Sequence, residues 1–482
     1  MNTKTILNEL RKIVGVDYVI HAPEDLLVYE YDGSIDRATP QFVVLPASSN
    51  DIIGIIKIAQ KYMLPVIPRG AGTGLSGGAI ASHGGIALVL TRMKSIIEID
   101  PINQIAIVEP GVVNIDLTKA ASKFGLYYAP DPSSQKACTI GGNIAENSGG
   151  PHCLAYGVTT NHVLAIEAVT ADSSIQWFGN KSGIEPGYDL RGIIIGSEGT
   201  LAIVTKIVLR LLQEPESINT LVATFPKMSD ASNAVSKIIG NGIIPAAIEM
   251  MDKLAIKAVE ASLNAGYPPN AEAILLVEID GLIEEVKNKS VSIQNICKAT
   301  NATDILIATD EKERNKLWAG RKAALGALGH LAPNYYLLDG VVPRTKLPQV
   351  LDEVAKISKK WKLPIANVFH AGDGNLHPCI LFDEKIPGET LKAQQAGGEI
   401  LELCVSVGGA LSGEHGVGIE KMKYMPLVFN EDDIGSMVRL KTVFDTNNLL
   451  NPGKIFPNTD THSNLTLTQT GAIRRAGPAS FI

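Results

Sequence analysis

Pro68-Arg69-Gly70-Ala71-Gly72-Thr73-Gly74-Leu75-Ser76-Gly77-Gly78 is the stretch that decides between two folds for the first half of this chain. It follows a predicted strand at 64–68, and its glycines would let backbone N–H groups surround a phosphate. Gly72, Gly74 and Gly77 formally match the GxGxxG pattern of a Rossmann unit. Such a unit needs a helix that opens at the third glycine, but only residues 79–82 precede the next glycine turn. The stretch therefore argues against a Rossmann fold.

Two further segments rich in small residues lie in the same half of the chain. The longer one is Thr139-Ile140-Gly141-Gly142-Asn143-Ile144-Ala145-Glu146-Asn147-Ser148-Gly149-Gly150-Pro151, preceded by Pro130-Asp131-Pro132-Ser133-Ser134, and the shorter one is Gly196-Ser197-Glu198-Gly199-Thr200. Small residues at this density would let a large, flat ligand lie against the main chain. Bulges and tight turns would explain any one segment alone, so the interpretation depends on finding several together.

Around these segments, short β-rich runs alternate with helical patterns. In the first half the pattern predicts helices at 49–62 and 114–124 and strands at 163–170, 174–178 and 201–212. After a linker at 213–217 it predicts strands at 218–225, 246–250 and 273–279 and helices at 229–241, 252–263, 282–300, 310–331 and 347–360. This mixture predicts an α+β fold, with an antiparallel sheet in the second half that carries helices on one face.

Composition excludes several classes of protein. A chain of 482 residues exceeds a single core, so two or three domains are expected. The net charge of −7 argues against a nucleic-acid partner. We find no signal peptide, and no apolar run approaches the roughly 18–20 residues of a transmembrane segment. The five cysteines are odd in number and lack a CxxC pair, which argues against disulfides and cysteine-ligated clusters. We expect a cytoplasmic protein, or one that is peripheral to the inner membrane.

His370-Ala371-Gly372-Asp373-Gly374-Asn375-Leu376-His377 predicts half of a metal site on a β-hairpin. Asp-Gly between two β-rich runs is typical of a two-residue turn. With Asp373-Gly374 at its centre, His370 would face His377 across the hairpin, with Cβ atoms about 5 Å apart. Two imidazoles at that separation can share one divalent ion. The alternative is a pair of packed, hydrogen-bonded histidines.

Ser412-Gly413-Glu414-His415-Gly416-Val417-Gly418 offers a carboxylate and a third imidazole. Two histidines and one glutamate would leave a metal with an open position, and the spare histidine could move a proton. A flavin-free metallohydrolase is one reading of this set, but it leaves the glycine-rich half unexplained. A scaffold subunit that keeps only the fold is another.

Taken together, the segments PRGAGTGLSGG, PDPSS, TIGGNIAENSGGP, YDLRGIIIGSEGTLAIVT, HAGDGNLH, SGEHGVG and NPGK resemble the FAD-linked 2-hydroxy-acid dehydrogenases of the vanillyl-alcohol-oxidase type. Within that family the chain is most similar to bacterial glycolate oxidase D subunits and D-lactate dehydrogenases, over roughly residues 5–457. The resemblance implies a two-part, PCMH-type FAD-binding domain at 38–217 and a ferredoxin-like substrate cap at 218–457. An N-terminal helix and connection (1–37) and a polar tail (458–482) would flank them.

The resemblance also implies which residues hold FAD. Around the pyrophosphate these are Pro68, Arg69, Gly70, Ala71, Gly72, Thr73, Gly74, Gly77 and Gly78. Along the flavin and ribityl chain they are Asp131, Ser134, Thr139, Gly141, Gly142, Asn143, Asn147, Ser148 and Gly149, and near the adenosine end Glu198, Gly199 and Ile203. Relatives that tether the flavin carry a histidine at the position of Thr73, so this chain is expected to bind FAD non-covalently.

For the chemistry, the resemblance implies a divalent metal, Zn²⁺ or Mn²⁺, on His370, His377 and Glu414. His415 would be the catalytic base and Arg321 the group that binds the substrate carboxylate. Without the family, a solvated surface arginine would be the expected reading of Arg321. The reaction implied is the removal of the hydroxyl proton and transfer of a hydride to the flavin, which yields a 2-oxo acid.

The substrate is predicted from two departures. Relatives that act on 2-hydroxyglutarate carry a lysine at the position of Leu337 and an asparagine at that of Cys379. Since an unpaired buried carboxylate is costly, we expect a small monocarboxylate, glycolate or D-lactate, with D-2-hydroxyglutarate as the alternative. The resemblance further implies companion subunits, one FAD-domain-like and one iron–sulfur, or a quinone acceptor.

Overall fold

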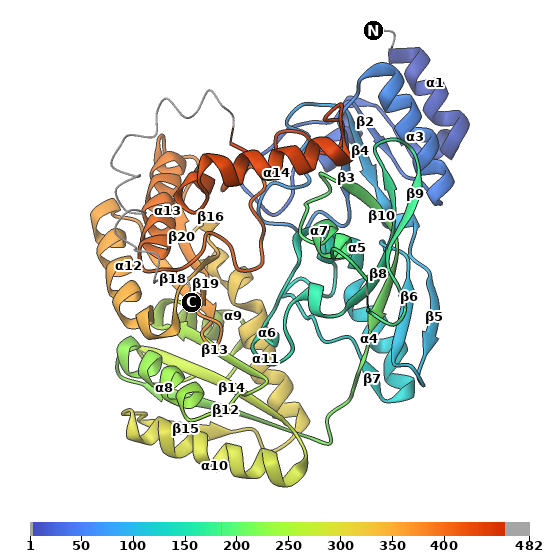
Figure 1. Ribbon diagram of the computed structural model, residues 1–482. Coiled ribbons are helices and arrows are strands. Elements are labelled where there is room, and N and C mark those ends of the chain that lie inside the picture. Colours follow the sequence, from blue (N-terminus) through green and yellow to red (C-terminus); the bar gives the residue numbers. More distant parts are fainter. Residues whose placement is uncertain (1–2, 185, 458–482) are drawn as a thin grey trace. The chain divides into compact units, whose positions relative to one another are not determined.

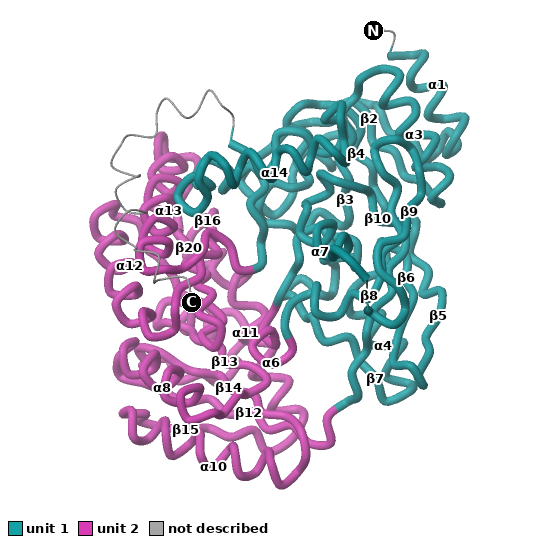
Figure 2. The backbone as a smooth tube through the Cα atoms, in the orientation of Figure 1, with its two compact units in different colours: residues 1–149, 157–214, 414–465 teal, residues 150–156, 215–413, 466–482 magenta. Residues whose placement is uncertain are grey.

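The computed structural model describes residues 3–184 and 186–457 (Figure 1). They form two compact units (Figure 2). Of the described residues, unit 1 holds 3–149, 157–214 and 414–457, whereas unit 2 holds 150–156 and 215–413. The boundary predicted from the sequence, 217/218, lies three residues after the division at 214/215. The predicted bounds do not include the two further places where the chain changes unit, at 150–156 and at 413/414.

Unit 1 begins with a four-stranded sheet in the order β1-β2-β4-β3. Its strands are β1 (Val19–Ile20), β2 (Phe42–Val44), β3 (Val66–Arg69) and β4 (Ile86–Val89), and the helices α1 (Thr3–Val14) and α3 (Ser49–Tyr62) pack with them in one core. The predicted helix 49–62 is confirmed to the residue. Ser48 caps its first turn by accepting from the Asp51 N–H, and Met63 ends it in the left-handed conformation.

Residues 70–85, which connect the parallel strands β3 and β4, contain no helix. A Rossmann crossover would need one there, so the exclusion of that fold is confirmed.

A second sheet of unit 1 has the order β5-β6-β10-β8-β9 and antiparallel pairings. Its strands are β5 (Ile96–Asp100), β6 (Ile105–Val108), β8 (Val163–Thr170), β9 (Ile175–Gly179) and β10 (Ala202–Arg210). All eight residues of β8 are buried, because apolar clusters cover both faces of the sheet. The helices α4 (Asn114–Ala121) and α5 (Ile140–Glu146) contribute to the cluster that also contains Ile166 of β8 and Ile207 of β10.

Unit 2 is built on one large sheet, in the order β15-β12-β14-β13-β18-β19-β17, which β20 and β16 extend beside β18. Its strands are β12 (Ser217–Phe225), β13 (Ala247–Asp252), β14 (Ala273–Gly281), β15 (Asp304–Ile307), β16 (Asn334–Leu337), β17 (Gly340–Val341), β18 (Ile365–His370), β19 (Asn375–Leu376) and β20 (Pro378–Phe382). The helices are α6 (Cys153–Tyr156), α8 (Met228–Gly240), α9 (Lys253–Leu263), α10 (Ile283–Ala299), α11 (Glu311–Ala327), α12 (Leu347–Trp361) and α13 (Glu389–Ser406). The described pairings are antiparallel, as predicted.

The expectation that helices cover only one face of this sheet is wrong. Asn219 of β12 accepts a hydrogen bond from Ser290 of α10, whereas the next residue, Thr220, donates to Glu278. Glu278 in turn accepts from Trp318 of α11. Since neighbouring residues of a strand point to opposite faces, α10 and α11 lie on opposite sides. This covering explains why the strand residues 273–279 are all buried.

Among the residues that the structure describes, no helix is both long and apolar enough to cross a lipid bilayer.

Candidate functional site

The glycine-rich stretch after β3 begins at a buried arginine. Arg69 is 7% exposed, and its Nη1 has no hydrogen-bond partner among the described residues. Its guanidinium folds over Gly72, where an added Cβ would lie 2.2 Å from Nη2 and φ is +74°. Burial lowers the pKa of Arg69, opposed by the charge of Asp32. A buried guanidinium with an unsatisfied Nη1, beside a backbone free of side chains, suits an anionic group such as a pyrophosphate.

The second segment opens as the short helix α5, which the sequence pattern did not predict. Thr139 caps it by accepting from the Gly142 N–H at 3.3 Å. Asn143 is held from within the unit, because Asn114 donates to its Oδ1 at 3.0 Å. Asn147, at φ 55°, ends the helix. The glycines of the first turn therefore present backbone with little side chain over it.

The three segments come together within unit 1. A Cβ on Gly70 would lie 2.3 Å from Thr139 Oγ1, and one on Gly199 would lie 3.0 Å from Pro68 Cγ. The Glu198 N–H donates to Ala145 O at 2.8 Å, which attaches the third segment to the end of α5. The predicted gathering of these segments is therefore present. Ile203, predicted near the adenosine, lies in β10 with its side chain in the apolar core.

Glu198 supports a loop of the same unit. Its carboxylate accepts from the N–H groups of Val417 at 2.7 Å and Gly418 at 2.8 Å. Burial raises the pKa of Glu198, while these two N–H donors and the charge of Lys421 lower it. Glu198 has φ 52°, a conformation that few non-glycine residues adopt. The segment 417–418, which follows His415 closely in the sequence, is thus fixed on the glycine-rich half.

In unit 2 the histidine hairpin differs from the prediction. His370 pairs with Asn375 rather than His377, so the loop has four residues, Ala371–Gly374, instead of two. In that loop only Gly374 has a positive φ, +74°. An added Cβ there would lie 2.1 Å from the Val342 carbonyl oxygen, and the Val342 N–H donates to Gly374 O at 2.9 Å. This outside contact, which the Asp-Gly pair cannot encode, widens the turn.

The two imidazoles nevertheless meet. Their ring centroids are 5.0 Å apart at an interplanar angle of 79°, and both residues are buried. Two further acids, which the sequence interpretation missed, lie behind them.

The first of these acids is Glu249 of β13, directly opposite His370 in the strand register. Its Oε1 lies 2.7 Å from His370 Nδ1, and its Oε2 accepts from Arg321 Nε at 2.7 Å. Arg321, on α11, is 3% exposed, so the reading of a solvated arginine is wrong. A lone acid within the apolar run Ala246–Met251 was the available sequence signal.

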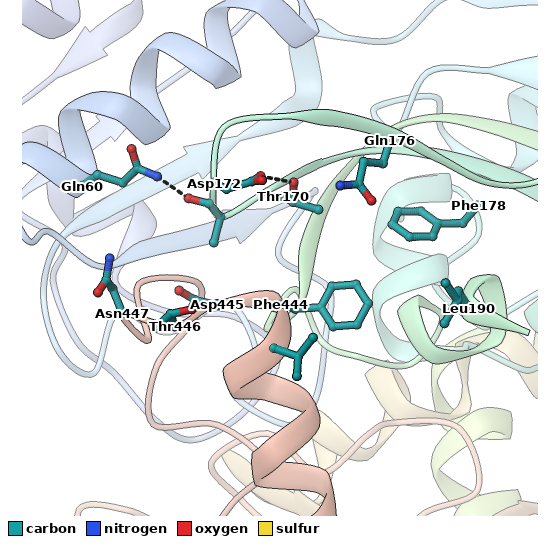
Figure 3. A pocket seen from close by; sticks show the side chains of 12 residues that line it. Gln60, Thr170, Asp172, Gln176, Phe178, Leu190, Phe444, Asp445, Thr446 and Asn447 are labelled. Carbon is teal, nitrogen blue, oxygen red and sulfur yellow. Dashed lines mark hydrogen bonds between the residues drawn. The ribbon is translucent and has the colours of Figure 1, made fainter. Parts of the chain in front are cut away.

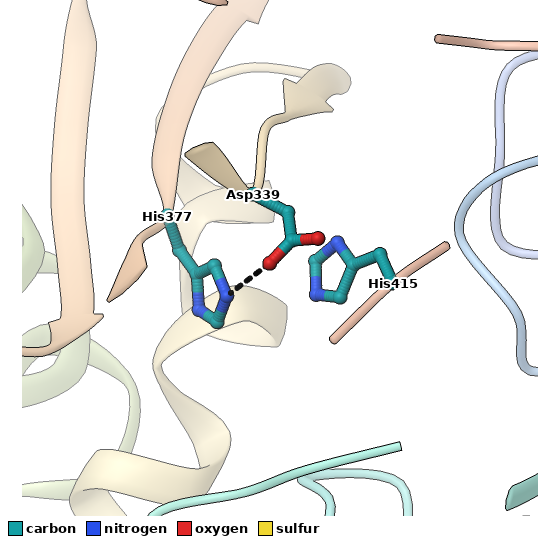
Figure 4. A group of neighbouring side chains, drawn as sticks. All are labelled: Asp339, His377 and His415. Carbon is teal, nitrogen blue, oxygen red and sulfur yellow. Dashed lines mark ion pairs between the residues drawn. The ribbon is translucent and has the colours of Figure 1, made fainter. Parts of the chain in front are cut away.

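The second acid is Asp339, and Figure 4 shows its carboxylate facing the His377 ring. Asp339 Oδ1 lies 3.5 Å from His377 Nε2, while Oδ2 accepts from Ser412 Oγ at 2.5 Å. The Gly413 N–H donates to Asp339 at 3.1 Å. Asp339 therefore fixes the two residues that directly precede Glu414 and His415. Those two predicted residues belong to unit 1, where His415 Nε2 lies 3.8 Å from Glu414 Oε1.

The two positions from which the substrate is predicted are neighbours. Leu337 pairs directly with Cys379 across β16 and β20, and both are buried. Directly opposed residues share a face of the sheet, so these two side chains lie side by side.

A separate pocket of unit 1 lies away from the predicted site residues (Figure 3). Its volume is about 390 Å³, and its lining includes Phe178, Phe444 and Asp172. Gln60 Nε2 donates to Ala171 O at its edge. None of the predicted site residues lines it.

Two family models match the chain. Residues 40–179 match "FAD binding domain", and residues 214–455 match "FAD linked oxidases, C-terminal domain". The three glycine-rich segments, 68–78, 139–151 and 196–200, are called the cradle below, and the first two lie in the first match. The histidines and Arg321 lie in the second match. A flavin-binding half contradicts the alternative of a flavin-free metallohydrolase.

Individual proteins agree with the models. The glycolate oxidase subunit GlcD of Escherichia coli K12 is 47% identical over 454 residues, which cover 94% of this chain and 91% of that protein. A D-lactate dehydrogenase of Archaeoglobus fulgidus is 34% identical, over 93% of this chain and 98% of that one. The solved structure of p-cresol methylhydroxylase with substrate bound shares the fold, with a TM-score of 0.81 at 16% identity over 95% and 97% of the two chains. The chain belongs to the FAD-linked oxidases.

Proposed function

We propose that this protein oxidises a small 2-hydroxy monocarboxylate, glycolate or D-lactate, to the 2-oxo acid. The names of the relatives support this substrate class, since they include a glycolate oxidase subunit and a D-lactate dehydrogenase. The observation that carries the proposal is in unit 2, where buried Arg321 and buried His370 contact one carboxylate, Glu249, and the His377 ring lies 5.0 Å from the His370 ring. A guanidinium fork suits a substrate carboxylate, and imidazoles suit the hydroxyl end.

FAD fits the cradle of unit 1. When bound, it supplies the acceptor for the hydride that leaves the substrate carbon. Arg69 and the N–H groups around Gly70 and Gly72 would bind its pyrophosphate, since Arg69 Nη1 has no hydrogen-bond partner within 3–184 and 186–457. The α5 glycines would lie along the flavin. Thr73 offers no nucleophilic imidazole, so we propose non-covalent binding.

A divalent ion, Zn²⁺ or Mn²⁺, fits the donor set of His370, His377 and Glu414, and when bound it would supply a Lewis acid for the substrate hydroxyl. The two histidines are close enough to share one ion. Glu414 follows Gly413, whose N–H is held at Asp339. Asp339 also lies 3.5 Å from His377 Nε2, so one carboxylate contacts the second histidine and the residue before the third donor.

The chain's own groups then bind and deprotonate the substrate. Contacts with Glu249 need two of the five N–H donors of Arg321, and the fork would pair the substrate carboxylate with others. His415 would accept the hydroxyl proton. Its segment is anchored on both sides, at Gly413 by Asp339 and at Val417 by Glu198.

Specificity would follow from Leu337 and Cys379. Burial raises the pKa of the Cys379 thiol well above its usual range, so at neutral pH neither Leu337 nor Cys379 carries a charge. A second carboxylate placed there would meet no cation from either residue. This supports a monocarboxylate over D-2-hydroxyglutarate.

Electrons would leave the flavin through companion subunits, one FAD-domain-like and one iron–sulfur, or to a quinone. A relative described as a subunit supports this. The five cysteines form no disulfide among the described residues, and Cys138, Cys297, Cys379 and Cys404 are buried.

We also propose that the FAD-binding domain spans 38–217 and the cap 218–457.

The test is to mix the purified protein anaerobically with glycolate, D-lactate, L-lactate and D-2-hydroxyglutarate in turn, and to follow bleaching of the visible flavin band. We expect glycolate or D-lactate to bleach it fastest, and chelator treatment to abolish the effect. Fastest bleaching by D-2-hydroxyglutarate would overturn the substrate assignment. Unchanged bleaching after verified removal of metal would overturn the metal assignment.

A further inference from the structure

One carboxylate in unit 2 contacts both a predicted metal ligand, His370, and the arginine predicted to bind the substrate carboxylate, Arg321. Glu249 is 1% exposed and lies on β13, directly across from His370 on β18. Directly opposed residues of antiparallel strands share a face, which brings the two side chains together. Glu249 Oε1 lies 2.7 Å from His370 Nδ1, and Oε2 lies 2.7 Å from Arg321 Nε and 2.5 Å from Nη2.

The contact with His370 determines which ring nitrogen can bind a metal. A carboxylate can only accept a hydrogen bond, so Nδ1 of His370 carries the proton. In the neutral ring the lone pair is then on Nε2. His377 has a weaker version of this support, since its Nε2 lies 3.5 Å from Asp339 Oδ1. Glu249 therefore determines both the tautomer and the orientation of the His370 ring.

The contact with Arg321 balances a charge that is almost fully buried, since Arg321 is 3% exposed. Burying a guanidinium without an anion is costly, and Glu249 supplies that anion. The helix that carries Arg321 is held closely as well. A Cβ on Gly320 would lie 2.6 Å from Ala265 Cβ and 2.8 Å from Tyr267 Cε2. The backbone of α11 is thus fixed at this point, and Glu249 fixes the end of the side chain.

We propose that Glu249 is a positioning residue that orients His370 for the metal and Arg321 for the substrate carboxylate at the same time. The inference rests on the proposed function. Because one carboxylate serves both groups, its loss should weaken metal binding and substrate binding together. Outer carboxylates behind metal-bound histidines typically change metal affinity 10-fold to 100-fold when they are replaced, roughly the effect expected here.

Glu278 provides a matched control. It is also a buried glutamate in this sheet, and it also accepts from an arginine (Arg314 Nε, 2.9 Å) and contacts a histidine (His152 Nε2, 3.2 Å). Its partners, Arg314 and His152, are not predicted to bind metal or substrate, unlike the partners of Glu249. Glu278→Gln should therefore perturb folding in a comparable way without changing the metal site.

The experiment measures Zn²⁺ affinity of metal-free, flavin-loaded protein by competition with a chromogenic chelator. We expect Glu249→Gln to weaken Zn²⁺ binding about 10-fold to 100-fold, while Glu278→Gln stays within about two-fold of the wild type. At saturating Zn²⁺, Glu249→Gln should still raise KM for the preferred substrate more than it lowers kcat. Glu249→Asp, which restores the carboxylate on a shorter side chain, should recover part of the Zn²⁺ affinity.

Each outcome separates this inference from the proposed function. Wild-type protein that fails to bind Zn²⁺ or Mn²⁺ would overturn both. Wild-type binding with equal affinity in Glu249→Gln, or an equal loss in Glu278→Gln, would overturn only the role of Glu249. If Glu249→Gln does not fold, Glu249→Asp carries the measurement, and wild-type affinity and KM in that variant would also contradict the inference.

Discussion

Two buried glutamates, one in each unit, hold parts of the proposed site in different ways. Glu198 accepts from two consecutive backbone N–H groups, those of Val417 and Gly418. Glu249 contacts two side chains, those of His370 and Arg321. The first carboxylate therefore determines where the main chain runs, and the second determines how functional groups point. Replacing the first should mainly affect stability, whereas replacing the second should mainly affect binding.

The largest effect is expected where an oriented ligand is removed. His370→Ala deletes the imidazole that Glu249 holds, and with it one metal donor. We predict no detectable turnover and loss of bound metal, with FAD retained because the cradle lies in unit 1. Metal content by elemental analysis and the flavin spectrum check this. A His370→Ala protein that keeps metal and full turnover would contradict the metal site.

The next largest effect is expected at His415, whose segment is held at Gly413 by Asp339 and at Val417 by Glu198. His415→Asn should lower kcat about 10²-fold to 10⁴-fold if the imidazole is the general base. Metal content and FAD should remain at wild-type levels, since neither depends on this ring in our proposal. Steady-state kinetics with the preferred substrate measure the change. A loss below about five-fold would contradict the role of His415 as the base.

Removing the backbone acceptor should have a smaller, mainly structural effect. Glu198→Ala would leave the N–H groups of Val417 and Gly418 without their acceptor, at a cost of roughly 1–3 kcal/mol in the free energy of unfolding. Glu198→Gln keeps an acceptor oxygen and should lose less. Urea denaturation of the FAD-loaded proteins distinguishes them. Zn²⁺ affinity should stay close to wild type, and a loss matching that of Glu249→Gln would remove the contrast between the two acids.

The smallest effect is a pH dependence carried by the control residue. Burial alone would raise the pKa of Glu278, but hydrogen bonds from His152 and Arg314 outweigh it and hold the pKa well below its usual range. The folded protein therefore keeps this carboxylate charged where the unfolded chain is protonated. This stabilisation is present above the unfolded pKa, about 4.3, and is lost as pH falls below it. Denaturation between pH 3 and 7 should show a shallower acid loss in Glu278→Gln than in wild type, and identical profiles would contradict it.

The sequence could predict elements whose signals are local. The helix after Ser48 has its cap and its apolar periodicity in the same segment, so its limits match the structure. The hairpin after His370 also carried a local signal, Asp-Gly, but the carbonyl of Val342 from another part of unit 2 changed the turn. The short helix α5 was hidden because its first turn contains two glycines.

The residues of the site could likewise be predicted only where their signals are local in the sequence. The glycine-rich segments and the histidines could be recognised from residue types and spacing. The structure brings the three segments together in unit 1 and, separately, the two histidines together in unit 2. Glu249 and Asp339 could not be assigned, because their partners lie far away in sequence: His370 is 121 residues from Glu249. Only the pairing of β13 with β18 makes that contact.

The exchange at residues 150–156 has a consequence for how the protein can be divided. Within the described residues the chain passes between units at 149/150, 156/157, 214/215 and 413/414. His152 and Tyr156, on the small insert, are bonded to Glu278 and Asp280 of the larger unit-2 segment. A gene fragment for 215–413 would therefore encode a cap that lacks its own histidine partner for Glu278. Neither unit is one continuous stretch of the chain. Expressing either unit separately would therefore require a gene with rearranged segments rather than a truncated gene.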